Sequence, residues 1–148
     1  MGNKRAGIII RKYGTNLILL EQGYGKSLPN NIFDIPKGHW EPGELLEDTA
    51  IREAKEEANI DIEPNELSFI GEFPYLKGDT LALFYCEKKF KLEDLKCSSY
   101  FENKQGKEVP EVVGYKLFDF VNDDLEDSHI YNNLRKILEK VFMVIQRY

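Results

Sequence analysis

Gly38 to Ile60 reads GHWEPGELLEDTAIREAKEEANI, and this segment contains the clearest predicted helix of the chain. A Pro-Gly pair precedes the helix, and alanine, a strong helix former, recurs inside it at four-residue intervals. These signals predict a helix from Glu44 to Ala58. Asn59 then ends it, because asparagine is the residue other than glycine that best tolerates the left-handed conformation that terminates helices.

Three glutamates crowd the last turns of this helix: Glu53, Glu56 and Glu57. Positions three and four apart share a helix face, so the three carboxylates point the same way. Each like-charge pair costs a few tenths of a kcal/mol, roughly 0.2–0.5, and the helix dipole adds to the penalty. Arg52 and Lys55 are too few to neutralise this charge, whereas a hard divalent cation would do so. A solvated glutamate-rich face is the alternative.

The spacing around these glutamates is specific. Five residues separate Gly38 from Glu44, seven more precede an Arg-Glu pair, two residues lead to a Glu-Glu pair, and Asn59-Ile60 closes the segment. This pattern resembles the signature sequence of the Nudix hydrolases. The family usually has glycine where Asn59 stands, and this departure leaves every carboxylate in place.

The resemblance implies an α+β fold of the Nudix type, an α/β/α sandwich with a mixed sheet between helices. It also implies a Mg²⁺-dependent hydrolase, with Mn²⁺ able to substitute, that cleaves a nucleoside diphosphate linked to another group. In this reading the metal ligands are Glu53, Glu56, Glu57 and the Gly38 carbonyl, and Arg52 and Glu44 orient the carboxylates. The general base is Glu53, Glu56 or a carboxylate outside the signature. Glu111, in VPEVVGY, stands where many relatives have an additional catalytic or metal-binding glutamate, and an exposed loop acid is the alternative.

The residues just before the helix bear on the substrate. FDIPKGHWEPGE, residues 33–44, resembles the corresponding stretch of asymmetric dinucleoside tetraphosphate hydrolases, and RAGIII, residues 5–10, resembles their opening strand. The resemblance makes diadenosine tetraphosphate and related dinucleoside polyphosphates the expected substrates. Phosphate contacts are expected from Lys37, His39 and Arg5, and base stacking from Tyr75 or Tyr85, with Phe73 and Tyr131 also available.

Two other functions are compatible with the same signature. An RNA 5′-pyrophosphohydrolase would act on triphosphorylated or nucleotide-capped RNA ends, although bacterial members tend to have glutamine and glycine where Lys37 and His39 stand. A nucleotide-binding Nudix module would recognise its ligand without cleaving it. Such modules commonly lose signature glutamates, and all of them are present here.

Composition limits the remaining possibilities. The 148 residues suit one domain, residues 1–148, and a net charge of −6 argues against a protein that coats DNA or RNA. Cys86 and Cys97 lack the paired spacing of a metal or redox site. No apolar run approaches membrane-spanning length, so we expect a cytoplasmic monomer or homodimer that binds a small nucleotide or an RNA 5′ end.

Hydrophobic patterns predict the remaining elements. Strands are expected at residues 5–11, 16–21, 32–35, 67–76, 80–87 and 112–120. Apolar residues at helical spacing predict a second helix over residues 130–145, capped by Asp127 or Ser128. Residues 22–31 are expected to form a loop. The charged segment 91–110, which contains Tyr100 and Phe101, is expected to be a long functional or disordered loop.

Overall fold

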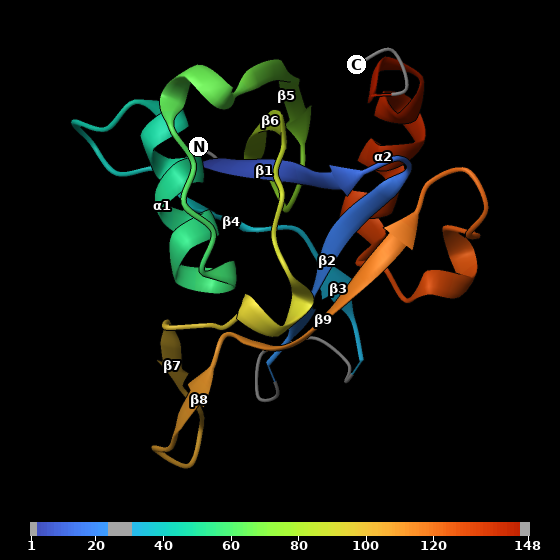
Figure 1. The fold of residues 1–148 in the computed structure, drawn as a ribbon. Coiled ribbons are helices and arrows are strands. Elements are labelled where there is room, and N and C mark those ends of the chain that lie inside the picture. The colour runs from blue at the N-terminus through green and yellow to red at the C-terminus, as the bar shows by residue number, and fades with distance from the viewer. Residues whose placement is uncertain (1–2, 24–30, 146–148) are drawn as a thin grey trace.

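A mixed β-sheet lies between two helices in the computed structural model, which describes residues 3–23 and 31–145 (Figure 1). Helix α1 spans Leu46–Ala58 and helix α2 spans Asn132–Ile145. The predicted α+β architecture, with a mixed sheet between helices, is therefore confirmed.

The sheet has the strand order β3-β2-β1-β6-β5, with β4 paired to β1 and β9 paired to β2. Among the strands of the described residues, β1 and β6 pair in parallel and the other pairs of this sheet are antiparallel. The strands are β1 (Lys4–Tyr13), β2 (Asn16–Gln22), β3 (Phe33–Asp34), β4 (Lys37–His39), β5 (Ser68–Pro74), β6 (Thr80–Glu87) and β9 (Val112–Asp119).

Alternation along β1 sends its isoleucines to opposite faces of the sheet. Ile8 and Ile10 pack in a cluster with the three alanines of α1, whereas Ile9 belongs to a second cluster with the leucines of α2. The small alanine side chains let α1 approach the sheet closely, and this approach places its glutamate face beside β4, with which α1 is in contact.

Helix α1 begins at Leu46, two residues later than expected. Leu45 occupies the N-cap position in an extended conformation, and its N–H is donated to the Asp48 carboxylate at 3.4 Å. The expected end is confirmed, because Asn59 adopts the left-handed conformation with φ 59°.

The expected start of the second helix is wrong. Asp127 and Ser128 lie in a 3-10 helix, η3 (Glu126–Ser128), and α2 starts only at Asn132. The backbone on either side of Ile130 pairs instead with Phe33: the Phe33 N–H is donated to the His129 carbonyl, and the Tyr131 N–H to the Phe33 carbonyl, both at 2.8 Å. A helix cannot begin while these groups are engaged with β3.

The segment from residue 91 to 110 is more regular than expected. It contains a 3-10 helix, η2 (Leu92–Asp94), and a hairpin of β7 (Tyr100–Glu102) and β8 (Glu108–Pro110). A further 3-10 helix, η1 (Pro64–Glu66), follows α1. Of the expected loop at 22–31, residues 24–30 lie outside the described residues. Within the described part of the chain, neither helix is long and apolar enough to cross a membrane.

Candidate active site

A pocket of about 360 Å³ opens where β4 meets the glutamate face of α1. It gathers residues from three parts of the chain: the start of β1, the segment around β4, and α1, with one further residue that directly follows β8. The lining residues are Arg5, Lys37, Gly38, His39, Glu41, Arg52, Glu53, Glu57 and Glu111. The structure therefore brings together most of the residues that the sequence singled out, and Glu44 and Glu56 interact with this group.

Gly38 is in close contact with Glu53. A Cβ atom on Gly38 would lie 1.8 Å from the Glu53 Oε1 and 2.2 Å from its Cδ, so only glycine fits unless the carboxylate moves. The neighbouring backbone N–H of Lys37 is donated to Glu57 Oε1 at 3.2 Å. The backbone of β4 thus fixes the positions of two of the carboxylates.

Arg52 links Glu44 to Glu53 at the rim of the pocket. Its guanidinium donates from Nε and Nη2 to the two oxygens of Glu44, at 3.2 and 3.0 Å, and from Nη1 to Glu53 at 3.4 Å. Thr49 also donates its hydroxyl to Glu44 at 2.9 Å. Mainly because of the hydrogen bonds from Arg52, the pKa of Glu44 falls to about 2. Arg52 thus contacts both Glu44 and Glu53, and its expected role in orienting the carboxylates stays a prediction.

Two of the other carboxylates, Glu53 and Glu57, have strongly raised pKa values. Burial raises the pKa of Glu57 to about 8, against the opposing effect of Lys37, and the charge of Glu53 adds to the rise. Burial likewise raises the pKa of Glu53 to about 7, with Glu56 as the next cause. The charge of Glu111 raises both pKa values. These four glutamates therefore form one electrostatically coupled group.

This group suits a hard divalent cation in its chemistry. Carboxylate oxygens and a backbone carbonyl are the ligands that Mg²⁺ and Mn²⁺ prefer, and excess negative charge is what a cation would relieve. In residues 3–23 and 31–145, however, no three His, Cys, Asp or Glu side chains are already arranged to hold a metal. The donor set fits the ion, and binding would require the carboxylates to move closer together.

Lys37 lies at the pocket with its ammonium already engaged. Its Nζ is 3.1 Å from the buried carboxylate of Asp34, which also accepts the Tyr75 hydroxyl. Although burial of Lys37 acts to lower its pKa, the charges of Asp34 and Glu57 outweigh that effect, so the pKa is raised and the side chain stays charged. A phosphate oxygen would have to share Lys37 with Asp34.

Arg5 and His39 face each other across the β1–β4 pair. Arg5 is bound to Asp79, with 2.9 Å between Nε and Oδ2. Burial and the nearby Arg5 charge lower the pKa of His39, so the imidazole is neutral at pH 7 and has one N–H to donate. Both residues line the pocket, and their contact with substrate stays a prediction.

The two tyrosines do not match the expected stacking role. Tyr75 is 6% exposed and donates its hydroxyl to Asp34, and Tyr85 is 3% exposed and accepts a hydrogen bond from Arg11 at 3.1 Å. A base needs an open ring face for stacking, and neither buried ring offers one. The other two candidates, Phe73 and Tyr131, are partly buried against the core cluster on the α2 face of the sheet.

Several residues that organise this site escaped the sequence analysis. Asp34 is 1% exposed and anchors Lys37. The sequence did carry a signal for this residue, because a carboxylate that stands between two apolar residues of a short predicted strand is expected to have a buried partner. Gly23 has no such signal. Its N–H is donated to the Glu111 carbonyl at 2.9 Å, and a Cβ there would lie 2.1 Å from the Pro110 carbonyl oxygen, so glycine permits the contact that holds Glu111 near α1.

The fold is a mixed sheet between two helices, and at the candidate site a glycine on one strand contacts a glutamate-rich helix face. The sequence identifies the class of protein that has this arrangement. The pattern of the NUDIX domain matches residues 2–122 of the chain. The chain therefore belongs to the Nudix family.

Comparison with individual proteins adds one relative in sequence and several in structure. An uncharacterized 17.7 kDa protein from the e-segB intergenic region of Enterobacteria phage T4 is 38% identical over 90 residues, which cover 57% of this chain and 60% of the phage protein. The match thus spans less than two thirds of that relative.

Among solved structures, a C. elegans Ap4A hydrolase in a binary complex superposes with a TM-score of 0.66 at 24% identity, covering 99% of both chains. The NUDIX domain of Shewanella oneidensis NrtR in complex with ADP ribose superposes with a TM-score of 0.70 at 12% identity, and the match covers 98% of this chain and 89% of that one. The Bacillus subtilis pyrophosphohydrolase BsRppH superposes with a TM-score of 0.67 at 20% identity. That match covers 99% of this chain and 82% of the BsRppH chain. At these identities the similarities show the fold.

Proposed function

We propose that this protein is a divalent-metal-dependent pyrophosphohydrolase that cleaves a phosphoanhydride bond in dinucleoside polyphosphates such as diadenosine tetraphosphate. The observation that carries the proposal is the coupled group of Glu53, Glu56, Glu57 and Glu111, of which Glu53, Glu57 and Glu111 line one pocket with Gly38. Such a concentration of carboxylates, two of them with raised pKa values, is typical of a functional site rather than of a solvated helix face.

In this mechanism Glu53, Glu56, Glu57 and the Gly38 carbonyl would hold Mg²⁺, which when bound would neutralise charge on the polyphosphate and activate water. Arg52 holds Glu44 and Glu53 in fixed orientations, so the carboxylates do not have to be ordered when substrate binds. A carboxylate of the group accepts the proton of the attacking water.

The other lining residues bind the anionic substrate. His39 donates its N–H to a phosphate oxygen, and Arg5 presents a cation on the same side of the pocket. The resemblance of residues 33–44 to dinucleoside tetraphosphate hydrolases supports this choice of substrate, and the fold shared with the C. elegans Ap4A hydrolase agrees with it.

The catalytic part of the proposal is tested with Glu56→Gln, which removes one charge with little change of volume. We expect Mg²⁺-dependent release of nucleotide products to fall by at least about a hundredfold, the loss typical of removing one key catalytic group. Glu47→Gln is the matched control, because Glu47 lies on the opposite side of the same helix and should leave activity intact. Equal activity of Glu56→Gln and wild type would refute the hydrolytic mechanism.

The substrate is tested by comparing kcat/KM for diadenosine tetraphosphate, ADP-ribose, nucleoside triphosphates and 5′-triphosphorylated RNA in one buffer. The proposal predicts the highest value for diadenosine tetraphosphate. A clear preference for ADP-ribose or free triphosphates would overturn it, and a preference for the RNA would identify the protein as an RNA 5′-pyrophosphohydrolase.

A further inference from the structure

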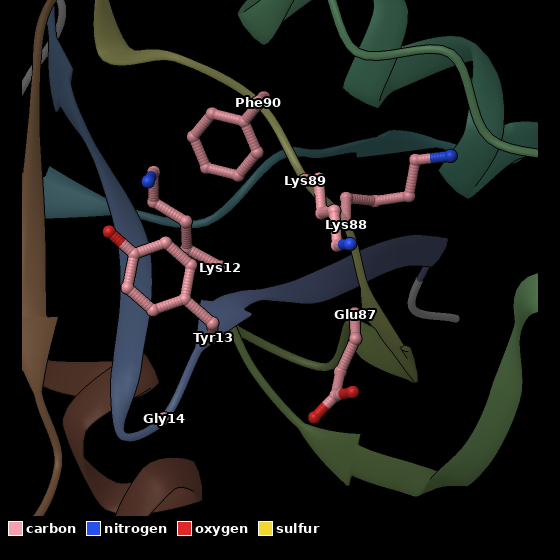
Figure 2. Close-up of a pocket in the computed structure, with 7 residues that line it drawn as sticks. All are labelled: Lys12, Tyr13, Gly14, Glu87, Lys88, Lys89 and Phe90. Atoms are coloured by element: carbon pink, nitrogen blue, oxygen red, sulfur yellow. The ribbon is translucent and has the colours of Figure 1, made fainter.

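A second pocket lies at the opposite end of β1 from the candidate active site. It has a volume of about 660 Å³ and is lined by Lys12, Tyr13, Gly14, Glu87, Lys88, Lys89 and Phe90 (Figure 2). Arg5 in the first pocket and Lys12 in the second are seven residues apart on one strand, which corresponds to about 23 Å. A ligand in this pocket therefore lies far from the coupled carboxylates.

Two aromatic rings and a lysine form the centre of this pocket. The Lys12 Nζ is 4.0 Å from the centre of the Tyr13 ring and 5.6 Å from that of Phe90 (Figure 2). Tyr13 is 59% exposed, so much of its side chain is accessible to a ligand. The strand register shifts between Arg11 and Tyr13, which interrupts the alternation of side chains between the two faces of the sheet. The consecutive residues Lys12 and Tyr13 can therefore line the same pocket.

The neighbouring strand supplies further positive charge. The Lys88 N–H is donated to the Arg11 carbonyl at 3.0 Å, which extends the β1–β6 pairing and fixes the Lys88–Phe90 segment beside Lys12. Lys88 is itself paired with Glu66 at 2.8 Å. Lys12 and Lys89 have no carboxylate partner among the described residues, so in a chain of net charge −6 this pocket retains two unneutralised cations.

We propose that this pocket is a second ligand site, which binds a nucleoside phosphate by stacking its base on the exposed tyrosine and holding its phosphate with Lys12 and Lys89. Stacking on aromatic rings beside basic groups is the general way in which proteins hold single nucleotides without reading their sequence. The cavity volume lies within the range of pockets for small ligands. The site does not depend on hydrolysis, so this proposal and the proposed function stand or fall separately.

The same chemistry is presented by a free nucleotide and by a nucleotide within an RNA chain. The experiment therefore uses two probes, AMP and a hexa-adenylate RNA with a 5′-hydroxyl end, added to the full-length protein in EDTA. Amide chemical shifts measured by NMR locate each probe. We expect shifts concentrated at residues 12–14 and 88–90, and the tighter of the two probes identifies the source of the nucleotide.

Variants then test the two halves of the site. Tyr13→Leu keeps an apolar side chain without a ring and should weaken AMP binding about tenfold, as expected for loss of one stacking contact. The double variant Lys12→Gln/Lys89→Gln should also weaken it, whereas Lys136→Gln/Lys140→Gln, with the same charge change on exposed positions of α2, should not.

Three results would overturn the proposal. The first is the absence of shifts at residues 12–14 and 88–90 with both probes at millimolar concentration. The second is an equal loss of affinity in the two double lysine variants, which would indicate unspecific charge attraction. The third is an equal response to inorganic phosphate alone, which would show that the rings take no part.

Discussion

At the scale of single residues, Gly38 is the most constrained position of the candidate active site. Its backbone touches the carboxylate of Glu53, and any Cβ atom would overlap that group. We predict that Gly38→Ala displaces Glu53 and lowers kcat by about a hundredfold, the loss associated with misplacing a catalytic group by about 1 Å. Steady-state kinetics with diadenosine tetraphosphate measure this effect.

The fold should tolerate this substitution, because the overlapping atoms belong to a side chain that can turn away. Circular dichroism and thermal melting of Gly38→Ala should therefore remain close to wild type. Gly14→Ala is the informative comparison: nothing lies within 4 Å of a Cβ there, but φ is +59°, so it should lower stability without lowering kcat. If Gly38→Ala retained full activity, the contact between β4 and Glu53 would have no catalytic importance.

At the scale of elements, the end of α1 depends on the left-handed conformation of Asn59. The Asn59 N–H is donated to the Lys55 carbonyl at 3.0 Å, and its side-chain amide to the Asp94 carbonyl at 3.1 Å. Asn59→Ala should lower the free energy of unfolding by about 1–2 kcal/mol, because the Cβ atom of alanine makes the left-handed conformation sterically unfavourable. Asn59→Gly, which adopts it freely, should lose less. Urea denaturation of the two variants measures the difference, and an equal loss would mean that the side-chain contact, and not the backbone, stabilises this end.

Elements with local signals were predictable from the sequence, and those held by distant contacts were not. The alanine spacing and Asn59 predict the extent of α1 to within two residues, because both act within the helix itself. The β7–β8 hairpin lies in a charged segment without strand periodicity, and it is anchored where the Glu111 N–H is donated to the Ser99 carbonyl. Tyr75 failed as a stacking residue for a similar reason, since its partner Asp34 is forty-one positions away.

The same distinction applies to the site. The signature predicted which glutamates share a face, because that follows from helix geometry alone. It did not predict that Lys37 would be shared with Asp34, because that contact depends on how the chain turns between β3 and β4 although the two residues are only three positions apart. It also did not predict that Gly23 would hold Glu111 in place, because these two residues are far apart in the sequence. Residues beside a helical motif are therefore easier to assign than the residues that support them.

At the scale of the whole molecule, the raised pKa values of Glu53 and Glu57 make the stability of the metal-free protein depend on pH. Both carboxyls have an ordinary pKa of 4.5, and in the folded protein these values rise to about 7 and about 8. The folded state therefore binds protons more tightly than the unfolded state between these limits. By linkage, the stability that these two groups contribute is fully present below about pH 4.5, falls as the pH rises towards the folded values, and is gone once the pH has passed about 8.

We predict that the Tm of the protein in EDTA falls as the pH is raised from 7 to 9, with each 1 kcal/mol lost appearing as about 2–4 °C. His39 has a lowered pKa and opposes the trend only below this range. Glu57→Gln should flatten the dependence, whereas Glu47→Gln should preserve it. Saturating Mg²⁺ should raise the Tm most at the alkaline end, because the ion binds ionised carboxylates and competes with protons for them. A metal-free Tm that rises with pH in this range, or a Tm that Mg²⁺ leaves unchanged, would mean that the four glutamates do not form the coupled cation site on which the proposed hydrolysis depends.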